Sequence, residues 1–388
     1  MAKIIMTKRD NYGDYQKEIT CKVEGKEAFA KEMCERFMAD NYGKGNITIH
    51  GATVKIGDLP QEEKELNEEV VAIYDNAGIP SFMYRITKKK NSDLFPGGSE
   101  KVHPAFIIGG EEYDEIYISV YPNCNINGKP YSLPHAKPWT NITNDKAAKA
   151  CFSKGEGWHL MTRAEWGLVA DICAMNGTFP HGNTNCEKYY GDETEKGESS
   201  GDYGITLTGS GPATWTHNHQ PDGIHDLCGN VWEMVRGFRI RNGFLEAAKN
   251  NDAATDIDLT AEGDDWCSVV DDEGKPIRIS VNDDGDIVIT SKKETKDTER
   301  NYDGCEWGNV TMDCDAEALK ELALFPGEPK AYFYVDSTYG EYLPLCGGSW
   351  LSTSNAGVFD VSLSSTRAYS SSGLGFRSAF YRKQVTEN

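Results

Sequence analysis

Three short motifs of glycine and aromatic residues stand in the C-terminal part of the chain: Cys346-Gly-Gly-Ser-Trp350, Asn355-Ala-Gly-Val-Phe359 and Gly375-Phe376-Arg377. Between them, small polar residues alternate with apolar ones such as Val361 and Leu363. A period of two predicts an extended or looped segment, with Val361 and Leu363 facing inward and the alternating set facing solvent. We call this set the displayed positions: Leu351, Ser352, Asp360, Ser362, Ser364, Ser365, Tyr369, Ser371, Ser372 and Gly373. They contain no evident nucleophile, base or metal cluster, so the pattern favours contact over catalysis.

Three further motifs precede these: Gly157-Trp-His-Leu-Met-Thr-Arg-Ala-Glu-Trp166, Phe179-Pro-His-Gly-Asn183 and Gly229-Asn-Val-Trp-Glu233. With Gly347-Gly-Ser-Trp350 and the final Gly-Phe-Arg, they resemble the formylglycine-generating-enzyme branch of the C-type lectin fold. Within that branch the chain is most similar to the variable proteins of diversity-generating retroelements, especially those carried by phages of gut bacteria. The resemblance covers roughly residues 103–382, apart from an insertion, and implies an α+β C-type lectin fold.

The resemblance also implies a role for the displayed positions. In that family an adenine-rich template, often with AAC codons, is copied with adenine errors into C-terminal codons. Leu, Ser, Asp, Tyr and Gly are all reachable from AAC by changing only adenines. The displayed positions would then be hypervariable ligand-binding residues within a variable region of about 346–377, although a plain Ser-rich loop has a similar composition.

The charge balance narrows the class of partner. The chain has 388 residues, enough for two or three modules. Its 40 basic and 61 acidic residues give a net charge of −21. Phosphate binding depends on clustered Lys and Arg, so we expect neither nucleic acid nor a membrane surface as the main partner.

Targeting signals and cysteine usage indicate the compartment. The first ten residues lack a long apolar core and a cleavage site, and no stretch approaches the length of a membrane span. Eleven scattered cysteines without a C-x-x-C pair do not describe a disulfide framework. We therefore expect folding in a cytoplasm, with most cysteines as buried free thiols.

We expect residues 1–100 to form a small α+β module that serves for attachment or oligomerisation. A lectin-type domain is expected over residues 103–388. The patterns in the module are a helix over Glu24–Asp40, a strand over Asn46–His50, an exposed helix start over Gln61–Glu69 and a linker over Asn91–Gly98.

The second domain begins with strand patterns over 106–110 and 115–121 and a helix over about 145–152. A second helix starts at Thr162, which forms a capping box with Glu165, and stops near Asn176-Gly177. Two early helices in an otherwise strand-and-loop domain fit the C-type lectin arrangement.

An acidic insertion occupies about 239–344 and contains a hairpin, Ile277–Val281 and Ile287–Thr290, around the turn Asn282–Asp286. The acids of this turn lack the spacing and closing Glu of an EF-hand loop, which favours a plain turn over a calcium site.

The residues that match the motifs of the formylglycine-generating relatives give little support to a catalytic function. Formylglycine-generating relatives need two copper-binding cysteines after the Gly-Gly-Ser motif, and this chain has Ser352 and Gly357 there. Cys346 precedes the motif, where a core thiol is expected. A second enzymatic branch uses an iron site from a helical domain that this sequence lacks. We expect no enzyme; an oxidase of this type with a displaced active site is the alternative.

Two groups of residues could hold a metal. His217, His219 and His225 include an H-x-H pair, but their loop favours histidines that form turns. The resemblance implies a structural Ca²⁺ site from a side-chain oxygen, two carbonyls and a Glu carboxylate, which fall on Asp226, Gly229, Val231 and Glu233. An equally weighted alternative is a buried ion pair between Glu233 and Arg377. Otherwise no cofactor is expected.

Five tryptophans lie inside the motifs or close to them, and we expect most of them in the core: Trp158, Trp166, Trp215, Trp232 and Trp350. Tyr369 is the expected energetic anchor of the displayed positions.

The combined interpretation is a non-enzymatic ligand-binding protein of a phage virion, placed at the tail, that recognises a host-surface protein or glycan. Other virion proteins would be partners, and a homo-oligomer, with a trimer as one option, is expected. A bacterial surface-displayed variable protein and a purely structural virion protein are the alternatives.

Overall fold

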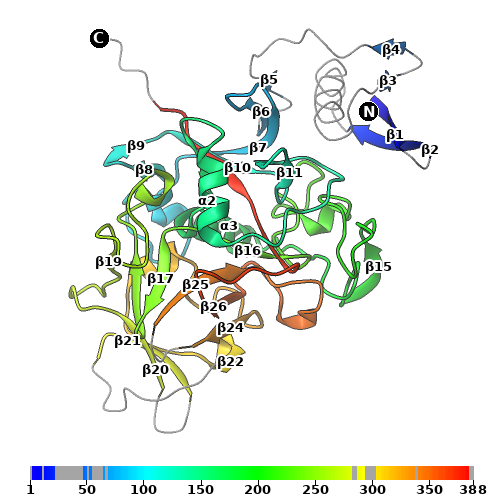
Figure 1. Cartoon of the computed structure of the whole chain (residues 1–388). Coiled ribbons are helices and arrows are strands. Elements are labelled where there is room, and N and C mark those ends of the chain that lie inside the picture. The colour runs from blue at the N-terminus through cyan, green and yellow to red at the C-terminus, as the bar shows by residue number, and fades with distance from the viewer. Residues whose placement is uncertain are drawn as a thin grey trace, which may run out of the picture.

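The computed structural model describes residues 2–10, 13–21, 47–49, 52–54, 64–65, 69–281, 286–292, 303–336 and 340–383, the first five ranges as strands only. The fold is mixed α+β and consists mostly of sheet (Figure 1). The helix predicted over Glu24–Asp40 and the acidic turn at 282–285 lie outside the described residues.

The N-terminal strands form a sheet in the order β2-β1-β3-β4. Their bounds are Ala2–Asp10 (β1), Gly13–Cys21 (β2), Ile47–Ile49 (β3) and Ala52–Val54 (β4). Strand β3 confirms the strand predicted over Asn46–His50.

A six-stranded sheet has the order β13-β28-β10-β7-β6-β5. Its strands are β5 (Lys64–Glu65), β6 (Val70–Tyr74), β7 (Pro80–Thr87), β10 (Glu115–Ser119), β13 (Trp158–Leu160) and β28 (Ser378–Phe380). Strand β7 pairs antiparallel with β10, so strands from before and after residue 100 belong to the same sheet. The helix start predicted over Gln61–Glu69 is wrong at Lys64–Glu65, which pair with β6 as a strand.

The segment predicted as a linker, Asn91–Gly98, packs against the body. It begins with a 3₁₀ turn, Asn91–Asp93, and Asn91 is fully buried. The Asn91 amide donates to Glu321 at 2.7 Å, and the neighbouring Ser99 backbone N–H donates to Glu317 at 2.6 Å. These two acceptors belong to helix α4 (Glu317–Glu321), so the predicted linker is a packed turn.

A larger sheet holds the C-terminal motifs, in the order β22-β24-β26-β25-β17-β18-β20-β21-β23, with β16, β19 and β27 joined to it. The bounds are β16 (Trp232–Met234), β17 (Phe238–Arg241), β18 (Phe244–Ala247), β19 (Cys267–Ser268), β20 (Arg278–Val281), β21 (Ile287–Thr290), β22 (Asp303–Glu306), β23 (Thr311–Asp313), β24 (Tyr332–Val335), β25 (Glu341–Cys346), β26 (Val361–Ser365) and β27 (Leu374–Phe376). The antiparallel pairing of β20 with β21 confirms the predicted hairpin.

The predicted insertion is an integral part of this sheet. Strands β17 and β25, at its two ends, pair antiparallel, with Ile240 opposite Tyr342. The chain therefore leaves and returns at neighbouring strands. Within the insertion, β24 pairs in parallel with β26, which carries several displayed positions. The insertion thus directly supports β26 and the displayed positions that it carries.

Both helices predicted for the second domain are present, as α2 (Asn144–Phe152) and α3 (Arg163–Asn176). The Thr162 hydroxyl accepts from the Glu165 N–H at 3.1 Å, and the Glu165 carboxylate accepts from the Thr162 N–H at 2.8 Å. Gly177 ends α3 with φ of 66°, a left-handed conformation that suits glycine. The capping box and the C-terminal glycine explain why this helix could be predicted from sequence.

Three pairs of short strands form separate two-stranded sheets among the described residues. The pairs are β8 (Ile107–Ile108) with β9 (Glu111–Glu112), β11 (Cys124–Ile126) with β12 (Lys129–Tyr131), and β14 (Lys188–Tyr189) with β15 (Asp192–Lys196). Among the cysteines whose side chains the structure describes, five are buried: Cys124, Cys151, Cys173, Cys228 and Cys346. None of the described helices is long and apolar enough to cross a membrane.

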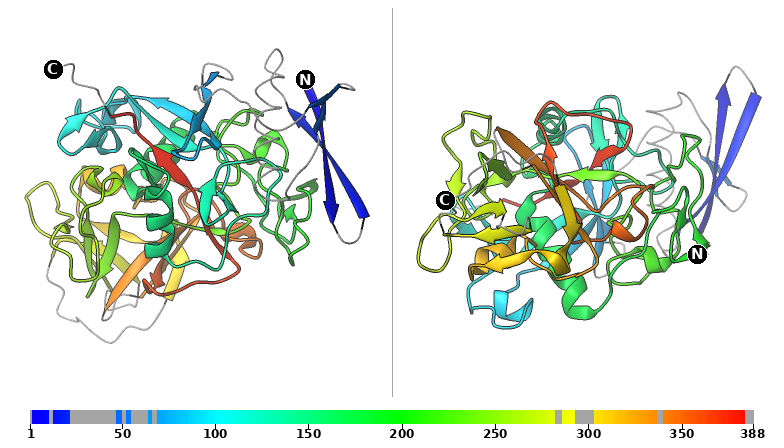
Figure 2. Two further views of the ribbon diagram at one scale, coloured as in Figure 1. Left: turned by 45° about the horizontal axis from the view of Figure 1, so that its top comes forward. Right: turned by 90° about the horizontal axis from the view of Figure 1, so that it is seen from below.

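The C-terminal segment joins the two large sheets. Strand β27 belongs to the larger sheet and β28 to the six-stranded one, and Figure 2 shows this segment in red. Arg377 lies between them, fully buried, and donates to the carbonyls of Ser119 and His225 at 3.0 Å each. The final Gly-Phe-Arg motif therefore fixes where the chain crosses from sheet to sheet.

Candidate functional site

Two of the sequence motifs meet beside the displayed positions. The Gly229 N–H donates to the Gly347 carbonyl at 2.9 Å, and the Trp350 N–H donates to the Asn230 carbonyl at 3.1 Å. Gly347 has φ of 88°, and a Cβ there would lie 2.5 Å from the Leu227 carbonyl oxygen. Only glycine fits this close, left-handed turn. The motifs therefore set the backbone from which the displayed segment starts.

Two buried tryptophans hold the next part of this segment. The Trp166 indole, from α3, donates to the Val358 carbonyl at 2.8 Å. The Trp307 indole, from the insertion, donates to the Phe359 carbonyl at 2.8 Å. Both rings are almost fully buried. Since both partners are core side chains, the backbone entering β26 has little freedom.

Seven of the ten displayed positions are exposed or half-buried. Leu351 is 60 % exposed and Tyr369 is 48 % exposed. The remaining five are Ser352, Ser364, Ser365, Ser371 and Ser372. Val361 and Leu363 are buried, as the alternation predicted.

The prediction of solvent exposure is wrong at Asp360, Ser362 and Gly373, which are all buried. Strand β26 lies between β24 and β25, so Ser362 is covered, and its hydroxyl pairs with that of Ser364 at 2.8 Å. Asp360 points into the protein beside Gly348, where a Cβ would lie 2.9 Å from its carboxylate. Gly373 lies under the Trp350 ring, which a Cβ would approach to 3.1 Å.

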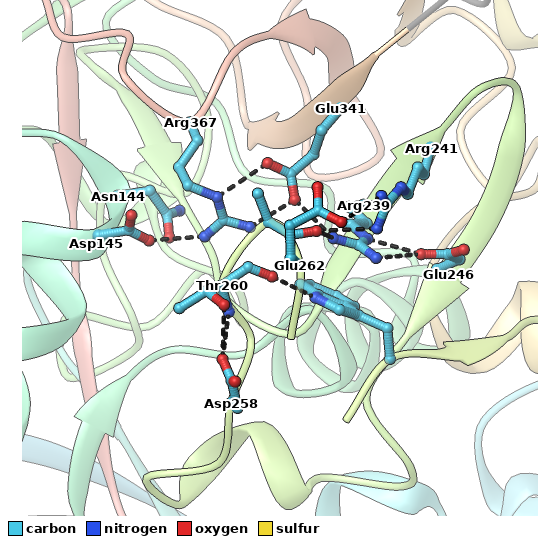
Figure 3. Close-up of polar contacts among 12 residues, drawn as sticks. Asn144, Asp145, Arg239, Arg241, Glu246, Asp258, Thr260, Glu262, Glu341 and Arg367 are labelled. Carbon is cyan, nitrogen blue, oxygen red and sulfur yellow. Dashed lines mark hydrogen bonds and ion pairs between the residues drawn. The ribbon is translucent and has the colours of Figure 1, made fainter. Parts of the chain in front are cut away.

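The loop at 366–372 is fastened at both ends. At its start, the Arg367 guanidinium donates to both carboxylate oxygens of Glu341 at 2.9 and 2.6 Å, and to Asp145 on α2 at 2.7 Å (Figure 3). At its end, the Asn141 N–H donates to the Ser371 carbonyl at 3.0 Å. Tyr369 stands exposed between these two attachments. We call residues 366–372 the display loop.

The Arg367 attachment belongs to a larger ion-pair network. Glu341 also accepts from Arg239 at 2.9 Å, and Arg239 in turn donates to Glu246 at 2.7 Å (Figure 3). Burial alone would raise the pKa of Glu341, but the hydrogen bonds from Arg367 and Arg239 bring it below its usual value. Glu341 is therefore a carboxylate at neutral pH. Arg367 was not among the predicted site residues; its signal in the sequence is that it is the lone charged side chain between Val361 and Gly375.

A cavity of about 370 Å³ lies next to this network, between α2, residues 235–238 and residues 256–266. Phe152, Trp266 and Leu343 give it apolar walls, and Arg236 and Arg367 line it as well. No displayed position lines this cavity. The predicted contact surface is thus separate from the cavity.

Three of the five motif tryptophans are core, namely Trp158, Trp166 and Trp215. Trp232 and Trp350 are only half-buried, so the prediction that most of the five are core is confirmed, with these two as the exceptions. Trp232 packs at the edge of a cluster that contains Met234, Leu374 and Phe376. Trp350 lies between Gly204 and Gly373, on the surface side of the motif.

At the residues predicted to bind calcium, the carboxylates of Glu233 and Asp226 both accept hydrogen bonds from other protein groups. Glu233 is fully buried, and both of its carboxylate oxygens accept from Arg377, one of them at 2.7 Å. Asp226 accepts from the Gly209 N–H at 2.7 Å. Among the described residues no three His, Cys, Asp or Glu side chains are placed to hold a metal. The structure has the alternative arrangement, the buried Glu233–Arg377 pair.

The three histidines make hydrogen bonds to the backbone. Nδ1 of His217 accepts from the Ile224 N–H at 2.9 Å. Nε2 of His219 lies 3.0 Å from the Phe179 carbonyl, and Nε2 of His225 lies 3.1 Å from the Pro221 carbonyl. Burial lowers the pKa of His217 to about 3, so it is neutral. These contacts order the loop at 217–225.

Cys346 is placed as a core thiol. Arg163 donates to its sulfur at 2.9 Å, and the residue is fully buried. Burial raises the pKa of the thiol to about 11, although Arg163 lowers it in part. A thiol with that pKa is almost entirely protonated at neutral pH and is a weak nucleophile.

No protein-family model matches this chain, and a search of curated proteins gave no match either. Among solved structures, the chain is similar to one called Major Tropism Determinant U1 Variant, with a TM-score of 0.28 and 11 % sequence identity. The similarity covers 87 % of this chain and 77 % of that one. A TM-score this low establishes neither a shared fold nor a shared function.

Proposed function

We propose that this chain is a non-enzymatic ligand-binding protein with a C-type lectin type of scaffold that presents a retroelement-diversified surface. The contacting residues are Leu351, Ser352, Ser364, Ser365, Tyr369, Ser371 and Ser372. The buried positions Asp360, Ser362 and Gly373 are left out of the surface.

The observation that carries the proposal is the contrast between a fixed backbone and free side chains. Buried tryptophans hold the carbonyls of Val358 and Phe359, and an arginine clamp holds the start of the display loop. Tyr369 and Leu351 project into solvent from this frame. A rigid frame with exposed Tyr and Ser side chains suits recognition, because Tyr supplies contact area at low entropic cost and Ser adapts its hydrogen bonds.

The five ordered motifs also favour this function over catalysis. They resemble retroelement variable proteins of phages, and the residues at the positions of the copper cysteines are Ser352 and Gly357. On this basis we place the protein in a virion, at the tail, where it binds a host-surface protein or glycan. Copies on one virion would add avidity to weak single contacts, which favours a homo-oligomer held by other virion proteins.

The decisive test exchanges only positions 351, 352, 364, 365, 369, 371 and 372 between two natural variants of the protein. We expect ligand or host preference to move with these residues, because specificity is a difference of affinities and the scaffold is common to both. Binding to immobilised extracts of the two host surfaces measures the preference.

The matched control exchanges residues 242–281 of the acidic insertion and leaves the C-terminal segment unchanged. Preference that follows the insertion would contradict the proposal. A genomic check is independent of binding: we expect a near-copy of codons 346–377 beside a reverse-transcriptase gene, differing only at adenines.

A further inference from the structure

The structure places a second chain segment beside the displayed positions. The Cys186 N–H donates to the Trp350 carbonyl at 2.9 Å, and the Thr353 N–H donates to the Thr184 carbonyl at 2.9 Å. A Cβ on Gly204 would lie 2.2 Å from Cδ1 of Trp350, so the backbone of that loop lies directly against the indole. Residues 184–186 and 203–204 therefore border residues 350–353.

This border carries exposed apolar side chains. Tyr203 is 80 % exposed, the highest value among the large hydrophobic residues that the structure describes, and Leu351 is 60 % exposed. The Cys186 thiol lies 4.0 Å from the Tyr203 hydroxyl. Across the Trp350 ring, Gly373 leads back to the display loop and Tyr369. We call Cys186, Tyr203, Trp350, Leu351 and Tyr369 the composite surface.

Single exposed apolar residues are ordinary on a soluble protein, whereas neighbouring ones mark interaction sites. Here the neighbours come from two segments about 150 residues apart, and short backbone contacts hold them together. The contact of Gly204 with Trp350 needs glycine, so the arrangement is built into the backbone.

Acidic residues flank the composite surface. Asp202 precedes Tyr203, and Glu187 follows Cys186. Lys137 approaches Asp202 only to 3.4 Å with both side chains largely exposed, and Glu187 forms no ion pair among the described residues. The whole chain carries a net charge of −21. A partner with basic side chains around its contact would therefore be attracted to this border.

We propose that the composite surface binds a protein segment that presents an apolar side chain flanked by Lys or Arg. This inference rests on the proposed function. It adds Cys186 and Tyr203, which lie outside the displayed positions, to the binding site. Leu351 follows Trp350 in the chain, and Tyr203 precedes Gly204, which lies against the same indole, so these exposed side chains provide an apolar centre and the acids provide a charged rim. That arrangement matches protein interfaces, which have apolar cores and polar rims with Tyr prominent among the strongest contacts.

The test uses a random peptide library displayed on phage and selected on the immobilised full-length protein. Affinities of the selected peptides are then measured for the wild type, Tyr203→Ser, Leu351→Ser and the control Met175→Ser. Met175 is 50 % exposed at the end of α3, so its replacement removes similar exposed apolar surface elsewhere. We expect peptides with an apolar residue flanked by Lys or Arg, at least tenfold weaker binding to the first two variants, and unchanged binding to the control.

The outcomes separate this inference from the proposed function. If Tyr203→Ser binds like the wild type while Leu351→Ser does not, the composite surface is wrong and the C-terminal surface stands. If Tyr203→Ser alone loses binding, both fail. A protein that selects no peptides but binds members of a glycan array would show that the partner is a glycan, which overturns the inference. Melting temperatures within a few degrees confirm that the variants are folded, as exposed substitutions usually change stability by about 0.5 kcal/mol or less.

Discussion

Asp360 lies fully buried, and neither of its carboxylate oxygens has a hydrogen-bond partner among the described residues. Burial raises the pKa of Asp360 well above its usual range, and the nearby carboxyl of Glu328 raises it further. Burial likewise raises the pKa of Glu328 to about 7. A buried carboxyl in this state is neutral in the folded protein but ionises in the unfolded chain, which makes folding less favourable as the pH rises.

We predict that Asp360→Asn stabilises the protein at neutral pH relative to acid pH. The folded pKa exceeds the unfolded value of about 4, so the contribution of Asp360 to stability is complete below about pH 4 and is lost as the pH rises toward its folded pKa. The advantage of the Asn variant should grow by up to about 1.4 kcal/mol per pH unit in that range. Urea unfolding at pH 4.5, 6 and 7.5 measures it.

Asp264→Asn is the control, since it makes the same substitution at an exposed position. An Asp360→Asn difference that stays constant with pH would mean that Asp360 is ionised in the folded protein and has a partner.

At the scale of elements, the display loop depends on a clamp from three other elements. Asp145 of α2 and Glu341 of β25 form ion pairs with Arg367. Arg239 of β17 forms an ion pair with Glu341 and so contributes indirectly. Arg367 and Glu341 are mostly buried, whereas Asp145 is largely exposed. Because exposed ion pairs contribute little, the Glu341 contact should dominate the clamp.

Arg367→Ala is therefore predicted to release the display loop while leaving the rest of the fold intact. We expect the free energy of unfolding to fall by about 1–2 kcal/mol, less than for a fully buried pair because the site is partly exposed. Amide hydrogen exchange at Tyr369 should speed up at least tenfold, while exchange in α3 should stay within the change in global stability.

Asp145→Asn removes only the exposed partner of Arg367, and we expect it to change stability by about 0.5 kcal/mol or less. Equal acceleration of exchange at Tyr369 by both variants would show that Glu341 is not the dominant contact. The prediction for Arg367→Ala is contradicted if Tyr369 exchange is unchanged.

At the scale of the whole molecule, sequence patterns predicted the features that depend on neighbouring residues but not those that depend on distant segments. The capping box of Thr162 and Glu165 predicted α3, and alternation around a turn predicted the β20–β21 hairpin, because both signals lie within a few residues. The burial of Ser362 depends on β24, which pairs with β26 from within the insertion. That pairing is non-local, so a period-two pattern could not show that both flanks of β26 are covered. For the same reason the sequence did not show that residues 184–186 and 203–204 border Trp350, or that β6 and β7 join the six-stranded sheet.

The insertion should therefore belong to the cooperative core, and we predict that Trp307→Ala shows this. Trp307 is fully buried and donates to the Phe359 carbonyl, so its truncation should cost about 3–5 kcal/mol in unfolding free energy. Trp350→Ala removes a half-buried ring of the same size and should cost clearly less, about 1–2 kcal/mol, since less apolar surface is lost from the protein interior.

Trp307→Phe keeps most of the side-chain volume and isolates the effect of the lost hydrogen bond, which should cost about 1–3 kcal/mol. Chemical denaturation of the three variants gives the order. If the free energy of unfolding of Trp307→Ala is no lower than that of Trp350→Ala, the insertion is a separate unit. The backbone that enters β26 is then fixed by α3 and the glycine motifs alone.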